Sequence, residues 1–188
     1  MSSLSKLLHV GWTLKGPDLL NLARTRKPTT FRPSASWYHD YPTAIIACLS
    51  LLEDPGRGRM SKLADRYSII GIGAGVAWHC LSVCVLARRT PRYERPLHSR
   101  SEIVRLIGSA ASEEVIWHKD GGFWETLLAS VGFGCTHLKI GSVAGSIHMA
   151  TFCLVSRWLE SRHGLMTSVL FHSAYNFAHD CDLGRRTP

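Results

Sequence analysis

The stretch YSIIGIGAGVAWHCLSVCVLA, residues 67–87, contains no Asp, Glu, Lys or Arg and is bracketed by Arg66 and Arg88. About 20 such residues in an α-helix, at a rise of about 1.5 Å each, match the roughly 30 Å hydrocarbon core of a bilayer. Its glycines weaken a helix in water, but in a membrane small residues let a neighbouring helix approach closely. The segment is therefore predicted to be a transmembrane helix, and the alternative is a buried helix of a water-soluble core.

Four further apolar segments follow it, at 103–117, 123–138, 140–159 and 165–179. Each is slightly short for a membrane span and each carries polar side chains, which on apolar helices are expected to face one another. Upstream, TAIIACLSLL at 43–52 is long enough only for a short interfacial helix or part of a broken one. The sequence thus predicts an all-α fold, a polytopic transmembrane bundle of about four to six helices.

Charge is distributed unevenly along the chain. The net charge is +8, with 45% hydrophobic and 19% charged residues, and the basic residues gather before residue 43 and in blocks at 57–66 and 88–100. Such blocks are attracted to the anionic surface of a bilayer, and the sequence contains no recognisable DNA- or RNA-binding helix. We expect a basic, partly flexible segment at 1–42, a membrane-embedded domain at 43–180 and a tail at 181–188. We expect the protein to be an integral, multi-pass membrane protein and to bind no nucleic acid.

Polar residues in the apolar C-terminal half form three motifs. The stretch SAASEEVIWHKDGGF, at 109–123, holds two adjacent acids, and two later segments each hold a pair of residues four apart, which share one face of a helix. The motifs are Glu113 with Glu114, Phe133 with His137, and His172 with Asn176. Ionisable groups are costly to bury in an apolar setting, so these are predicted to form a functional site. The alternative is a structural polar network whose members satisfy one another.

In this order the motifs resemble those of the CPBP intramembrane proteases, which include the CAAX prenyl endopeptidases and the bacterial Abi proteins linked to bacteriocin processing and self-immunity. The family pattern is EExxxR, then FxxxH, then HxxxN or HxxxD, on consecutive transmembrane helices; here these read EEVIWH, FGCTH and HSAYN. The resemblance covers residues 103–179, the motif-bearing core. It implies a CPBP-type core and an endopeptidase that cleaves a membrane-associated, prenylated or peptide substrate.

Two departures from the family pattern bear on activity. His118 stands where the family has Arg, and an imidazole cannot make the bidentate fork that a guanidinium makes to a carboxylate. The interval between Glu113 and His137 also looks shorter than usual for the family. A second hypothesis is therefore a catalytically impaired protein on the same scaffold, acting as a binding or self-immunity factor.

Peptide hydrolysis requires a base to activate water and donors to stabilise the oxyanion. Glu113, matching the first acid of the family motif, is the candidate base, because an apolar site and a second carboxylate both favour a carboxyl group that can exchange protons near neutral pH. His137 would share the water, and His172 and Asn176 would bind the oxyanion. Glu114, His118 and Phe133 are expected to support these four residues.

The sequence leaves open whether the site uses a metal ion. The roles above need no metal, and in that glutamic-type version no cofactor is expected. Alternatively, Glu113, His137 and His172 could form a zinc site of two histidines and one carboxylate with an open position for water. Asn176 is a poor zinc ligand, which favours the metal-free version slightly.

Overall fold

The part of the chain that the structure describes is entirely helical. The computed structural model describes residues 4–26, 37–53, 66–86, 100–117 and 122–185. These ranges hold seven helices and no strand: α1 Leu4–Thr25, α2 Trp37–Glu53, α3 Ile70–Leu86, α4 Arg100–Trp117, α5 Phe123–Thr136, α6 Leu138–His163 and α7 Leu165–Arg185. The predicted all-α class is confirmed, and every apolar segment named above contributes to a helix.

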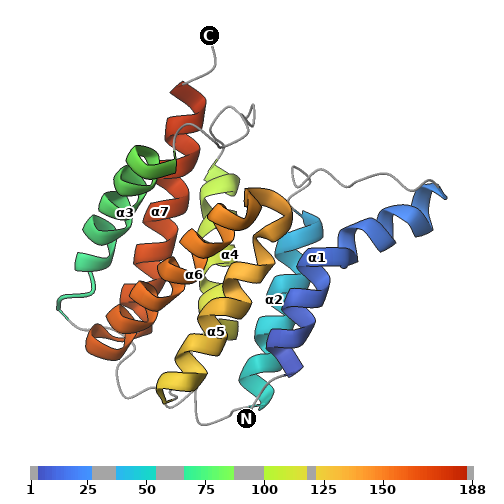
Figure 1. Ribbon diagram of the computed structural model, residues 1–188, viewed down its shortest axis with the longest axis horizontal. Helices are drawn as coiled ribbons and strands as arrows, with labels where there is room; N and C mark the ends of the chain where they lie inside the picture. Colours follow the sequence, from blue (N-terminus) through green and yellow to red (C-terminus); the bar gives the residue numbers. More distant parts are fainter. Residues whose placement is uncertain (1–3, 27–36, 54–65, 87–99, 118–121, 186–188) are drawn as a thin grey trace.

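With α1, the described ranges hold seven helices, whereas four to six were predicted. Helix α1 lies within residues 1–42, expected to be partly flexible, and it is anchored by the fully buried His9. The indole N–H of Trp117 on α4 donates to Nδ1 of His9 at 2.9 Å. Pro17 lies inside α1 and supplies no backbone N–H, and the C-terminal part of the helix bends away from the bundle (Figure 1).

Helix α3 contains most of the stretch predicted to span a membrane. It runs from Ile70 to Leu86, 17 residues, because the chain at 66–69 forms a turn. Taking length and hydropathy together, no helix in the described ranges is long and apolar enough to cross a bilayer. The prediction that residues 67–87 form a transmembrane span is therefore not supported, and neither is the predicted polytopic transmembrane bundle.

The helices pack in a bundle in which α3 lies along α7, α5 along α6, and α2 along α4 (Figure 1). Helix α4 also contacts α7, which brings the two ends of the motif-bearing core together. Gly71 and Gly75 form the face of α3 that meets α7. A Cβ atom at either position would overlap a backbone carbonyl oxygen of α7, that of Thr167 or that of Phe171. The missing side chains let the two backbones approach closely, as small residues do in packed helix pairs.

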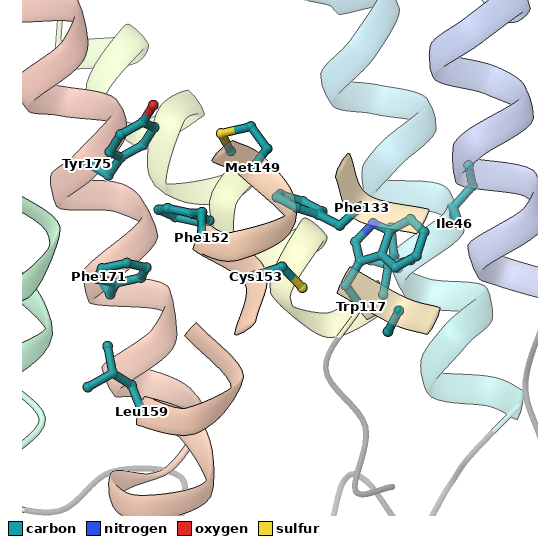
Figure 2. Packing of buried hydrophobic residues seen from close by; sticks show 12 residues of the cluster. Ile46, Trp117, Phe133, Met149, Phe152, Cys153, Leu159, Phe171 and Tyr175 are labelled. Atoms are coloured by element: carbon teal, nitrogen blue, oxygen red, sulfur yellow. The ribbon is translucent and has the colours of Figure 1, made fainter. Parts of the chain in front are cut away.

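A row of aromatic rings crosses the middle of the bundle from α7 to α4 (Figure 2). Phe171 stacks on Phe152 with ring centroids 4.6 Å apart, Phe152 stacks on Phe133 at 6.3 Å, and Phe133 meets the edge of Trp117 at 5.9 Å. Aromatic pairs at these separations stabilise a core beyond the area they bury. The row fixes α4, α5, α6 and α7 relative to one another, and these helices carry all the predicted site residues within the described ranges.

The exterior of the bundle is rich in apolar side chains, whereas its interior holds many polar ones. Each of the seven helices exposes large hydrophobic residues, among them Leu7, Ile45, Val76, Val104, Leu128, Ile147 and Phe177. Buried polar or charged residues include His9, Thr43, Glu113, Glu114, Ser156, Arg157 and His172. Exposed apolar side chains and buried polar ones therefore occur together in the described helices.

Candidate active site

Glu113 and Glu114, the acid pair, lie on the last two turns of α4, and both side chains are buried. Glu113 is 7% exposed and Glu114 is 2% exposed. Neighbouring residues of a helix project about 100° apart, so both can be buried only where the helix is covered on two sides. Helix α4 meets this condition because it packs against α2 on one side and α7 on another.

His172 of α7 is the residue that the two carboxylates share. Its Nδ1 lies 2.7 Å from Oε1 of Glu114, and its Nε2 lies 3.6 Å from Oε2 of Glu113. A carboxylate only accepts hydrogen bonds, so the short contact means that Nδ1–H donates to Glu114. That bond orients the imidazole and directs Nε2 toward Glu113. The structure thus joins the first and third motifs at one buried point.

Glu114 has a second partner on α6. The hydroxyl of Ser156 donates to Oε2 of Glu114 at 2.9 Å, while Oε1 accepts from His172. Both carboxylate oxygens of Glu114 are therefore engaged by side chains of two other helices. Glu114 therefore binds the imidazole of His172 while Ser156 holds its other oxygen.

The second motif meets the site through the ring of Phe133. The centroid of that ring is 5.0 Å from the imidazole of His137 and 6.0 Å from that of His172. His137 ends α5 as its C-cap, and its Nδ1 lies 3.1 Å from the carbonyl oxygen of Phe133 and 2.9 Å from the hydroxyl of Thr136. The ring of Phe133 therefore contacts both histidines of the second and third motifs.

Two predicted site residues contribute differently. Asn176 lies one turn after His172 on α7 and is half-buried, and within the described ranges it makes no hydrogen bond to His172 or to the acid pair. His118, at the position where the family motif has Arg, lies outside the described residues. The structure therefore brings Glu113, Glu114, His172, Phe133 and His137 into one region, and within the described residues Asn176 makes no hydrogen bond to them.

His148 lies in a polar cluster that was not predicted from the sequence. The indole N–H of Trp78 donates to its Nε2 at 3.2 Å, and the hydroxyls of Ser82 and Tyr175 lie 2.9 and 3.4 Å from the same nitrogen. Because Nε2 accepts from an indole, it carries no proton, so the imidazole is neutral. The indole and imidazole also stack with centroids 5.5 Å apart. No periodicity in the sequence indicates this cluster, since its members come from α3, α6 and α7.

Arg157 was also missed, although the sequence contains a signal for it. It is a charged residue inside the apolar segment 140–159, and it is only 8% exposed. A buried charge needs compensating partners, so its presence in that segment predicts contacts with other helices. Its neighbour Ser156 is the residue that binds Glu114.

Among the described residues, no three His, Cys, Asp or Glu side chains converge in a way that could hold a metal ion. The proposed zinc ligands Glu113, His137 and His172 all lie in this part of the chain.

Comparisons of this chain with protein-family models, with curated proteins and with solved structures find no match.

Proposed function

We propose that the protein is a membrane-embedded endopeptidase that hydrolyses a peptide bond with water activated by Glu113. The observation that carries this proposal is the buried contact of Glu113 and Glu114 with His172, which joins two motifs almost sixty residues apart in the sequence. Two carboxylates and an imidazole in an apolar bundle are the groups that acid–base hydrolysis requires. The resemblance to the CPBP proteases in the order of the motifs supports the same reaction.

The chemistry assigns different roles to the two acids. Glu113 would accept a proton from water as the hydroxide oxygen bonds to the substrate carbonyl carbon, and it would return that proton to the leaving amine when the C–N bond breaks. Glu114 would hold His172 through Nδ1. To donate from Nε2 to the oxyanion, His172 must carry a proton on both nitrogens, and the two carboxylates compensate that positive charge.

The distribution of side chains supports a lipid environment. Large hydrophobic residues on the outside of every described helix have no cover in a water-soluble monomer, whereas acyl chains would cover them. Polar groups that meet inside an apolar bundle are characteristic of membrane proteins. In the sequence, basic blocks at 57–66 and 88–100 flank α3, and Lys and Arg next to an apolar helix are attracted to anionic headgroups.

A lysine at position 76 tests the environment. Val76 is exposed at mid-length of α3, so Val76→Lys would be harmless in water but would cost about 2.5–3.5 kcal/mol facing hydrocarbon. We expect the fraction of protein that resists alkaline carbonate extraction to fall several-fold. Ile70→Lys is the matched control, because Ile70 is equally exposed but begins the helix, where a lysine reaches the interface. Wild-type protein that stays soluble without detergent would overturn the membrane assignment.

His172→Gln tests the enzyme against the binding scaffold. Glutamine can still bond to Glu114, but it cannot take up or release a proton, so cleavage of a peptide library by purified protein should fall about 100-fold. His163→Gln, at the end of α6, is the control and should retain activity. If wild-type protein binds a peptide without cleaving it, and both variants bind it equally well, the scaffold hypothesis replaces the enzyme.

A further inference from the structure

Arg157 of α6 is a buried cation that donates hydrogen bonds to α4 and α5. Its Nη1 donates to the carbonyl oxygen of Trp117 at 2.7 Å, and its Nη2 donates to the hydroxyl of Thr126 at 3.1 Å. The side chain is almost fully removed from solvent, at 8% exposure. Placing a guanidinium there costs desolvation energy, which these directed contacts offset.

The position of the guanidinium explains why a cation is suited to this place. Trp117 is the last residue of α4, and the carbonyl groups at a helix end have no partner within the helix. The C-terminus also carries the negative end of the helix dipole, so a cation there is favourable. Arg157 therefore binds the end of the helix that carries Glu113 and Glu114, about one turn beyond them.

Ser156 and Arg157 together contact α4 at two points. Ser156 donates to the carboxylate of Glu114, and Arg157 donates to the carbonyl of Trp117, three residues later. Two contacts about one turn apart restrict both the rotation of α4 about its axis and its movement along that axis. The third group, Thr126, lies near the start of α5, so the guanidinium also fixes α4 relative to the helix that carries Phe133.

We propose that Arg157 is a positioning residue for the acid pair. The expected change in kcat rests on the proposed function, whereas the expected change in the geometry of the site does not. Arg157 acts through α4: it holds the last turns of that helix so that Glu114 stays bonded to His172 and Glu113 stays beside Nε2 of the same ring.

The test uses Arg157→Gln, Arg157→Lys and the control Arg162→Gln, which removes an exposed arginine from the same helix. The first readout is the Nδ1–H proton resonance of His172 in protein labelled with ¹⁵N-histidine. We expect Arg157→Gln to shift or broaden this resonance and to lower kcat about 100-fold with little change in KM, as a misplacement of about 1 Å does. Arg157→Lys keeps the charge without the planar fork. Its His172 resonance and its kcat should therefore lie between those of the wild type and those of Arg157→Gln. Arg162→Gln should change neither.

An unchanged His172 resonance and unchanged kcat in folded Arg157→Gln would overturn the proposal. If that variant does not fold, two milder variants decide: Thr126→Val removes only the hydroxyl that accepts from Nη2, and Arg157→Lys keeps the charge without the fork. An unaltered resonance in both contradicts the positioning role. If wild-type protein cleaves no peptide, the proposed function fails, while the resonance still reports whether Arg157 orients the site.

Discussion

Replacing Glu113 with glutamine is expected to lower kcat about 1,000-fold, within the range that general acid–base groups contribute. Glutamine has the shape of glutamate but cannot accept a proton from water at neutral pH. The amide fills the same buried position, 7% exposed in the glutamate, so folding should change little. The measurement is single-turnover cleavage of a peptide substrate, with the melting temperature of the variant in detergent as a check on folding.

Glu114→Gln provides the matched comparison on the adjacent residue. Both oxygens of Glu114 accept hydrogen bonds, from Ser156 and from His172, and the NH₂ group of a glutamine cannot accept. One buried donor would lose its acceptor, at about 1–3 kcal/mol. We therefore expect Glu114→Gln to destabilise the protein more than Glu113→Gln and to reduce kcat less.

Glu125→Gln controls for the loss of a negative charge, because Glu125 is exposed in the first turn of α5. It should leave both kcat and melting temperature unchanged. The assignment of the base to Glu113 would be wrong if Glu113→Gln retained full activity. Reversal of the two effects, with Glu114→Gln the less active and more stable variant, would move the base to Glu114.

Replacing Gly75 with alanine should destabilise the protein by about 3 kcal/mol, the upper end of the usual cost of overpacking. The added methyl group would overlap the carbonyl oxygen of Phe171, a backbone atom that cannot move without displacing α7. Since His172 follows Phe171 directly, the same displacement should weaken the contact between His172 and Glu114. Unfolding titrations in mixed detergent measure the free energy, and cleavage measures the effect on the site.

Gly73→Ala is the control for helix propensity. Gly73 is two residues before Gly75 on the same helix, is exposed, and has nothing within 4 Å of the position that a Cβ would take. Alanine is favoured over glycine in a helix by about 1 kcal/mol, so Gly73→Ala should be neutral or stabilising. Equal stability of the two alanine variants would show that the close approach of α3 to α7 does not hold in solution.

Much of the local structure is predictable from the sequence. The apolar segments at 43–52, 103–117, 140–159 and 165–179 all lie in helices, because a helix is closed by hydrogen bonds between residues four apart and needs no distant partner. The same argument places Phe133 and His137 one turn apart. This argument does not predict how α1 packs on the bundle, because that depends on the hydrogen bond between His9 and Trp117, which are more than one hundred residues apart.

The candidate site was predictable as a set of residue types and only in part as an arrangement. The motif order selects Glu113, Glu114, His137, His172 and Asn176, but it does not say that Asn176 is left without a bond to the acid pair while Ser156 binds it. The function itself stays a proposal. Short motifs report which side chains share one helix face, and they carry no information on which other helix that face meets.

The residues alone therefore determine the all-α class, the positions of most helices and the polar groups available for chemistry, since all three depend on contacts within a few positions of the chain. The tertiary structure decides which of these groups meet: His172 with the acid pair, Arg157 with the end of α4, and α3 with α7 through Gly71 and Gly75. Apolar faces of similar composition can pair in many ways. The choice among them comes from side-chain shape and from the need to satisfy each buried polar group, which only the packed bundle expresses.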